Sequence, residues 1–119
     1  SELTLASGRR ADIMALSPKG DVWIVEIKSS VADFRADTKW PDYKDYCDRM
    51  FFASHEDVPS ELFPPEQGLI MADAFRADIL RDAPEHRLSA ARRKAVMLRF
   101  ASAAATRLHH MADPGLNGL

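Results

Sequence analysis

Hydrophobic and polar positions along the chain predict several short strands and two helical regions. Runs rich in β-branched and aromatic residues, bounded by turn residues, are typical of strands. Such runs predict strands at residues 2–6, 9–16, 21–28 and 49–54, a fifth strand from Gly68, and a sixth within residues 75–83. Helical patterns predict a helix that begins at Ser30, a short second helix over residues 42–47, and a long alanine-rich helix over residues 89–111.

The first helix has a local start signal and a local stop signal. Ser30 has the features of an N-cap, and Asp33 stands where its carboxylate can bond back to the Ser30 amide. Pro41 should break or kink this helix. Because a helical crossover separates strands 21–28 and 49–54, those strands should be parallel. The predicted fold class is therefore α/β, a mixed sheet flanked by helices.

The segment "SPKG" predicts how the second and third strands pair. Ser17, Pro18 and Gly20 suit a type I turn, and Gly20 also suits the left-handed position of a three-residue hairpin loop. If Ser17 faces Asp21, the register places Asp12 directly opposite Glu26. A two-residue or four-residue loop would instead place Asp12 opposite Ile27, on the other face.

The predicted register has a chemical consequence. Two carboxylates directly opposite on antiparallel strands repel each other unless a cation lies between them. Mg²⁺ is a suitable cation, because it takes one or two protein carboxylates and leaves its other positions to water and phosphate. Lys28 projects from the same face as Glu26 and could stabilise developing charge. The alternative is structural: Glu26 and Lys28 lie at a solvent-exposed strand end, and Asp12 pairs with Arg9 or Arg10.

Size and composition predict one globular domain over residues 1–119, since 119 residues with 46% hydrophobic content suffice for one core. No apolar run is long enough to span a membrane, and no signal-peptide pattern opens the chain. Together with the single Cys47, these features predict a cytoplasmic protein. The first residue, Ser1, is not Met, so we expect further residues upstream, with an N-terminal helix among them.

Charge is unevenly distributed, although the net charge is only −2 with a pI near 6.0. Residues 86–112 contain only basic charges. On the long helix a basic stripe about 120° wide is formed by Arg92, Arg93, Arg99, Arg107 and His110. Such a stripe can follow a nucleic-acid backbone or remain a solvated face. The opposite side is predicted to pack on the sheet through Leu88, Ala91, Ala95, Leu98 and Ala105.

Residues around the predicted hairpin resemble a known family. "AD" at Ala11 and Asp12, followed by "EIK" at residues 26–28, resembles the bipartite motif of the PD-(D/E)XK nuclease superfamily. Three longer segments are similar to the bacterial MmcB-related DNA repair family. They are "ELTLASGRRADIMAL", "VWIVEIKSSVADFRADTKWPDYKDYCDRMFFA" and "PPEQGLIMAD", which together cover most of the chain.

The resemblance implies a restriction-endonuclease-like core and a Mg²⁺-dependent or Mn²⁺-dependent nuclease that acts on DNA in repair. It implies that Asp12, Glu26 and the Ile27 carbonyl hold the metal and that Lys28 is the catalytic lysine. Two features depart from the superfamily pattern. Ala11 replaces the motif proline, and the first helix, which often supplies another acid, is absent. Glu2 could stand in for that acid, or be an exposed residue at a strand start.

Further residues are candidates for substrate binding. They are Arg10, Lys39, Tyr43, Arg92, Arg99 and Arg107. Each has an ordinary structural alternative as a surface, core or ion-paired residue. The alternative function is a noncatalytic nuclease-fold module that binds DNA or a repair partner. Modest basicity and the missing helix favour that alternative, whereas retention of both acids and the lysine favours catalysis.

Overall fold

The computed structural model describes residues 3–4 and 10–112, and within these ranges it places the side chains of residues 12–109. The strands are β1 (Leu3–Thr4), β2 (Arg10–Ala11), β3 (Ile13–Leu16), β4 (Val22–Ile27), β5 (Arg49–Ser54), β6 (Gly68–Ala72) and β7 (Ala77–Arg81). The α-helices are α1 (Val31–Ala36) and α2 (Ala90–Ala112), and the 3₁₀ helices are η1 (Trp40–Tyr46) and η2 (Ser60–Leu62). The elements follow the predicted order. The predicted strand of residues 9–16 is divided at Asp12 into β2 and β3.

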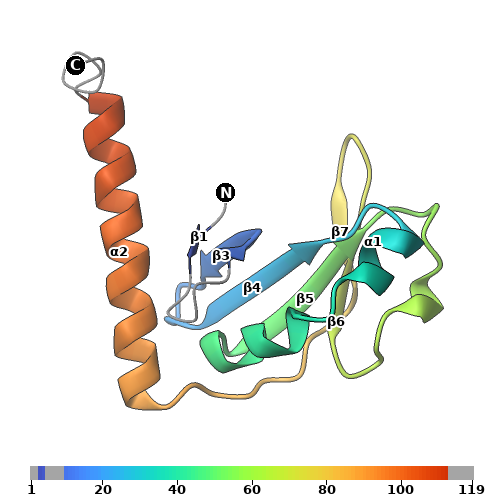
Figure 1. Cartoon of the computed structure of the whole chain (residues 1–119), viewed down its shortest axis with the longest axis horizontal. Coiled ribbons are helices and arrows are strands. Elements are labelled where there is room, and N and C mark those ends of the chain that lie inside the picture. Colours follow the sequence, from blue (N-terminus) through green and yellow to red (C-terminus); the bar gives the residue numbers. More distant parts are fainter. Residues whose placement is uncertain (1–2, 5–9, 113–119) are drawn as a thin grey trace.

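The five-stranded mixed sheet has the strand order β3-β4-β5-β6-β7 (Figure 1). The central pairs β4–β5 and β5–β6 are parallel, whereas the outer pairs β3–β4 and β6–β7 are antiparallel. The parallel pairing of β4 and β5 confirms the crossover prediction. β1 and β2 form a separate two-stranded antiparallel ladder.

The turn between β3 and β4 has the predicted conformation. Gly20 has φ 85°, its amide donates to the Ser17 carbonyl at 2.9 Å, and the Ser17 amide donates to the Asp21 carbonyl at 2.9 Å. A left-handed φ favours glycine because other residues would bring Cβ against the backbone. Leu16 therefore faces Val22, which confirms the predicted register.

Helix α1 begins as predicted but differs in two details. Ser30 is the N-cap, and its hydroxyl accepts from the Asp33 amide at 3.0 Å. The Asp33 carboxylate bonds the Ser29 amide at 3.2 Å, not the predicted Ser30 amide. Pro41 does not kink this helix, because α1 has already ended at Ala36, and the proline instead occupies the first turn of η1. Proline suits that position since the first helical amides have no partner within the helix.

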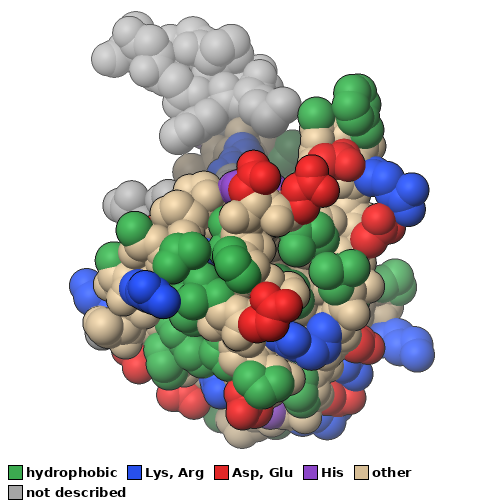
Figure 2. All heavy atoms as spheres, turned by 90° about the vertical axis from the view of Figure 1, so that its right-hand side faces the viewer, with side chains coloured by type: hydrophobic (Ala, Val, Ile, Leu, Met, Phe, Trp, Pro, Cys, Tyr) green, Lys and Arg blue, Asp and Glu red, His purple; other side chains and the backbone are tan. Residues whose placement is uncertain are grey.

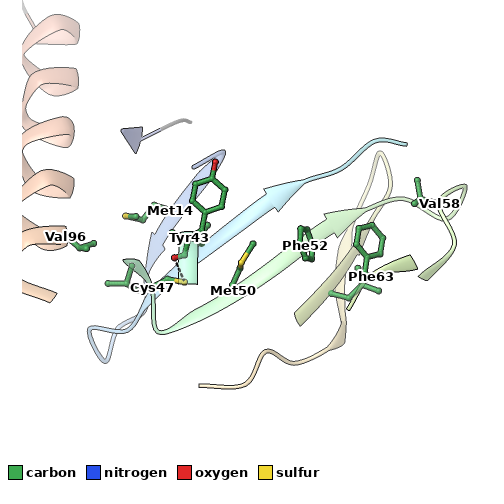
Figure 3. Packing of buried hydrophobic residues seen from close by; sticks show 11 residues of the cluster. Met14, Tyr43, Cys47, Met50, Phe52, Val58, Phe63 and Val96 are labelled. Atoms are coloured by element: carbon green, nitrogen blue, oxygen red, sulfur yellow. Dashed lines mark hydrogen bonds between the residues drawn. The ribbon is translucent and has the colours of Figure 1, made fainter. Parts of the chain in front are cut away.

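Buried side chains lie on both faces of the sheet. On one face a large cluster extends from Val96 of α2 along β4 and β5 to Phe63 and Val58 (Figure 3). Phe52 lies within it and contacts Phe34, Trp40 and Phe63 at ring-centroid distances of 5.3, 5.1 and 5.4 Å. The other face has a smaller cluster, built from Val25, Phe51 and Ala83. Helix α1 and η1 cover the first face, so charged groups there lie beside a helical layer.

Helix α2 packs through a different side from the one predicted. Val96 is buried, Met97 and Phe100 are packed against the large cluster, and Leu98 is 59% exposed. Ala91, Ala95 and Ala105 are also exposed. The prediction was wrong for the helix because it placed Arg93 on the solvent side, whereas Leu88, just before the helix, packs against the large cluster as predicted. All residues from 101 to 109 are exposed, and this part of α2 projects away from the sheet (Figure 1). In the described ranges no helix is both long and apolar enough to cross a membrane.

Arg93 lies on the packed side of α2 because it binds a buried carboxylate. Asp48 is fully buried just before β5, and its two oxygens accept from the Arg93 guanidinium at 2.7 and 2.8 Å. The same carboxylate accepts from the amides of Val22 at 2.7 Å and Leu88 at 2.9 Å. Burial would raise the pKa of Asp48, but Arg93 and the two amides outweigh it and hold this pKa far below the ordinary value.

We expect Asp48→Asn to lower the free energy of unfolding by about 3–5 kcal/mol, because it leaves the Arg93 charge without its partner. The loss should be full above about pH 4 and should shrink at lower pH, since a carboxylate with a depressed pKa stabilises the fold only while it is ionised. Urea unfolding at several pH values would measure both effects. The control is Asp45→Asn, at an exposed position of η1. An equal, small loss in both variants would contradict the central role of Asp48.

Candidate active site

The carboxyl groups of Asp12 and Glu26 lie together beside the junction of β2 and β3. The β3–β4 ladder ends, in the predicted register, at the pair Ile13 and Val25, and the next residues along the two strands, Asp12 and Glu26, are joined by a side-chain hydrogen bond. Asp12 leaves the strand conformation, and its Oδ2 accepts from the Ile27 amide at 2.9 Å. The carboxylate of Asp12 is therefore held against the end of β4 by a main-chain bond.

Glu26 is buried, with only 3% of its surface exposed. Burial, a hydrogen bond with Asp12 and the negative charge of Asp12 raise the pKa of Glu26 to about 8, while the charge of Lys28 acts in the opposite direction. Near neutral pH Glu26 therefore carries a proton. The Oε1 atom of Glu26 is buried and has no hydrogen-bond partner among the residues that the structure describes. A buried oxygen without a partner is costly, and such groups are found where a ligand or ion is bound.

Lys28 lies beyond Glu26 on the same side of the strand. Its ammonium binds Asp37 Oδ2 at 2.6 Å, and the two side chains are 8% and 16% exposed. The Lys28 carbonyl accepts from the Ser54 hydroxyl at 2.7 Å, and its amide donates to the Ala53 carbonyl at 2.9 Å. These bonds to β5 hold the end of β4, so both acids and the lysine occupy defined positions.

Asp37 was not among the predicted site residues. It is the C-cap of α1, and its Oδ1 accepts from the amides of Lys39 at 2.9 Å and Trp40 at 3.1 Å. Burial would raise the pKa of Asp37, but the bonds from Lys28 and these amides lower it. The only sequence signal was an acid just after a short helix, and that pattern is common at helix ends.

The four groups form two neighbouring pairs, Asp12 with Glu26 and Lys28 with Asp37. Two of the carboxyl groups are hydrogen-bonded to each other, and the third neutralises the lysine. This arrangement fits a hard divalent cation, since Asp12 and the unpartnered Glu26 oxygen are oxygen ligands of the kind Mg²⁺ prefers. Within the part of the chain that is described, no three His, Cys, Asp or Glu side chains are grouped to hold a metal. The coordination of a divalent cation here would therefore consist of two carboxylates, a main-chain oxygen, water and phosphate.

The other predicted site residues are more scattered. Lys39 is exposed at the start of η1, whereas Tyr43 is 8% exposed and belongs to the large core cluster. Arg92 lies over the Tyr46 ring at 4.7 Å. Arg99 and Arg107 are exposed on α2, which lies near the start of β4, at the opposite end from the acids (Figure 1). Glu2 and the Arg10 side chain lie outside the described parts.

An apolar hollow lies on the other face of the sheet and reaches the end of β4, where Lys28 also lines it. Its volume is about 580 Å³. It is lined mainly by Ile13, Val25, Ile27, Ala53, Ile70 and Ala72. Beside it the hairpin between β6 and β7 projects from the body and carries hydrophobic side chains at its tip (Figure 2). Glu26 points away from this hollow because consecutive strand residues alternate between faces.

Comparison with known proteins identifies the family. The family model "DNA repair protein MmcB-like" matches residues 1–115, nearly the entire chain. The chain belongs to the MmcB-like family of DNA repair proteins. Among solved structures, the "SPO1766 protein of unknown function from Silicibacter pomeroyi" is similar to this MmcB-like chain with a TM-score of 0.89 and 49% sequence identity. The match covers 97% of this chain and 80% of that chain. No curated protein matches the chain.

The raised pKa of Glu26 predicts how the metal-free MmcB-like protein responds to pH. The unfolded chain releases the Glu26 proton near the ordinary value of 4.5, whereas the folded chain keeps it to about 8. The contribution of Glu26 to the free energy of unfolding is therefore lost as pH rises from 4.5 to about 8, at no more than about 1.4 kcal/mol per pH unit. We expect Glu26→Gln to lack this loss and to gain stability relative to the parent as pH rises.

Urea unfolding in EDTA at several pH values would measure the difference between Glu26→Gln and the parent. Glu61→Gln, at an exposed position of η2, is the matched control. A difference between Glu26→Gln and the parent that stays constant with pH would show that Glu26 ionises at an ordinary pKa.

Proposed function

We propose that this MmcB-like protein is a metal-dependent phosphodiesterase that cleaves DNA, with a restriction-endonuclease-like core of the PD-(D/E)XK type. The observation that carries the proposal is the meeting of Asp12 and Glu26 beside Lys28. Two facing carboxyl groups, of which Glu26 is buried, lower the stability of a fold, and a cation bound between them would offset that cost. The raised pKa of Glu26 and its unpartnered Oε1 make a cation site the best account of this pair.

The local topology supports the same core type. An antiparallel hairpin, β3–β4, presents the acids and the lysine, and the crossover through α1 and η1 leads to the parallel strand β5. Membership of a DNA repair family makes DNA the expected substrate. The carboxylate motif itself is short, so the topology is the stronger support.

Each residue has a defined role in the proposed reaction. Asp12, Glu26 and the Ile27 carbonyl would hold Mg²⁺ or Mn²⁺. Such an ion, when bound, activates water and neutralises charge on a phosphate. Lys28 carries a fixed positive charge beside the acids and stabilises negative charge that develops on the scissile phosphate. Burial of Glu26 and Lys28 strengthens these electrostatic effects, because less water screens them.

DNA contacts are proposed at two regions. Lys39 is exposed next to the Asp37 that binds Lys28, so it can reach a phosphate close to the site. Arg92, Arg99 and Arg107 lie on α2 at the other end of β4 and would contact DNA farther from the cleaved bond. Tyr43 is packed in the core, and its role is to support η1.

Asp12→Asn tests the metal site. The Asn oxygen can still accept from the Ile27 amide, and the negative charge that disfavours ionisation of Glu26 is removed, so the metal-free variant should be at least as stable as the parent. Mg²⁺ should raise the melting temperature of the parent and hardly affect the variant, because only the folded parent binds it. Cleavage of single-stranded, duplex or branched DNA by the parent should require Mg²⁺ or Mn²⁺ and stop in EDTA.

The structural alternative gives a different result for Asp12→Asn. If Asp12 is the partner of a nearby arginine, the variant should lose about 1–3 kcal/mol and respond to Mg²⁺ as the parent does. Asp21→Asn, on the same hairpin but at its turn, controls for loss of one negative charge. A destabilised variant with an unchanged Mg²⁺ response would overturn the assignment of Asp12 as a ligand.

Substrate binding by α2 predicts a salt-dependent effect. Changing Arg92, Arg99 and Arg107 to Gln should weaken DNA binding and lower the slope of log K against log salt by roughly one unit for each phosphate that α2 no longer neutralises. Binding titrations at several salt concentrations would give the slope. The control changes three exposed cations elsewhere, Lys19, Arg76 and Arg87, to Gln. Equal slopes for the parent and the α2 variant would identify α2 as a solvated surface.

A second candidate function is a noncatalytic module that binds DNA or a repair partner. The observation that favours it is α2, which projects from the sheet and contains no acidic residue. This helix could bind DNA without any contribution from the Asp12–Glu26 pair. Salt-dependent DNA binding without cleavage in Mg²⁺ or Mn²⁺ would select this function over the nuclease.

A further inference from the structure

Asp37 and Lys28 form an ion pair that is largely shielded from water. The ammonium lies 2.6 Å from Asp37 Oδ2, and exposure of the two side chains is 8% and 16%. An exposed pair of this kind contributes little, because solvent screens it and both side chains lose freedom. A shielded pair is stronger and holds its partners in one geometry. The position of the Lys28 ammonium is thus set by Asp37.

Asp37 is itself fixed from several sides. Its Oδ1 accepts from the amides of Lys39 and Trp40, which leaves Oδ2 for Lys28. Its own amide donates to the Phe34 carbonyl at 3.1 Å as the C-cap of α1. Phe34 and Trp40 both pack on Phe52 of β5. Asp37 is therefore held by hydrogen bonds to Phe34, which precedes it in the chain, and to Trp40, which follows it, and both of these residues pack in the aromatic core.

Lys28 has a competing partner in the acid pair. It lies two residues from Glu26 on the same strand, so its charge acts on Glu26, and Glu26 Oε1 has no hydrogen-bond partner. Without Asp37, a flexible lysine side chain would turn toward that oxygen. An ammonium bound there would occupy the position of a cation and neutralise its ligands.

We propose that Asp37 is a positioning residue that holds the Lys28 ammonium away from the Asp12–Glu26 pair, which leaves the pair open to a divalent cation and keeps Lys28 beside it as a separate positive charge. This inference rests on the proposed metal-dependent function and deepens it. It assigns to Asp37 a role in metal affinity that acts through Lys28.

Asp37→Asn tests this role, because the Asn oxygen can still accept from the Lys39 and Trp40 amides while the charge that holds Lys28 is lost. We expect roughly tenfold weaker Mg²⁺ binding, measured by calorimetry and by the Mg²⁺-dependent melting temperature. DNA cleavage at saturating Mg²⁺ should also fall. The double variant Asp37→Asn with Lys28→Met should regain Mg²⁺ affinity without regaining cleavage, because the competing ammonium is gone.

Asp33→Asn is the matched control, since Asp33 lies on the same helix and bonds the Ser29 amide instead of Lys28. Unchanged Mg²⁺ affinity in Asp37→Asn would overturn the proposal. Weak Mg²⁺ binding that persists in the double variant would also overturn it, because the effect would then be structural and independent of Lys28.

A metal-free measurement separates failure of this inference from failure of the proposed function. In EDTA, NMR contacts of the Lys28 ε-methylene protons should move from Asp37 in the parent to Glu26 in Asp37→Asn. If the parent binds no Mg²⁺ but these contacts move, the metal function fails and the positioning by Asp37 stands. If the Lys28 contacts do not move, the positioning role fails whatever the protein does with metals.

Discussion

The Asp48 carboxylate is the interaction on which the arrangement of the whole domain depends. Asp48 is fully buried. Its carboxylate binds the Val22 amide at the start of β4, the Leu88 amide in the segment before α2, and the Arg93 guanidinium of α2. The Asp48 amide also donates to the Val22 carbonyl at 2.7 Å. One acid therefore joins parts of the chain that are distant in sequence. It satisfies main-chain amides that would otherwise be buried without partners, which is costly in a protein interior.

The two ends of β4 have different roles, since Asp48 anchors its start and the charged groups of the candidate site lie at its other end. Val22, at the anchored end, is held by Asp48, and Glu26 and Lys28 lie at the far end between β3 and α1. Both ends contain buried charges, but their balance differs. At Asp48 the acid is fully paired with Arg93 and with main-chain amides. Among the described residues around Glu26, the three acids Asp12, Glu26 and Asp37 exceed the one lysine, Lys28, and one carboxyl oxygen has no partner. This local excess of acid distinguishes the candidate site from a structural ion pair.

Local sequence features predicted much of the fold. The residues of "SPKG" determine the turn, the turn determines the register, and the register places Asp12 opposite Glu26. The Ser30 cap and the bounds of β5 were likewise predicted, because capping and strand patterns act over a few residues. The roles of Asp48 and Asp37 were missed. Each binds a partner through tertiary contact, and an acid near a helix end or strand start carries no signal of its partner.

The sequence by itself determined the order of elements, the hairpin register and the identity of the facing acids, since these follow from interactions between near neighbours. Tertiary structure alone decided which side of α2 is buried, because Arg93 lies on the side that carries Val96, Met97 and Phe100 and binds the buried Asp48 there. It also decided that Tyr43 is a core residue and that Lys28 pairs with Asp37. Such outcomes depend on burial and on partners brought together by folding, and neither is encoded in local spacing.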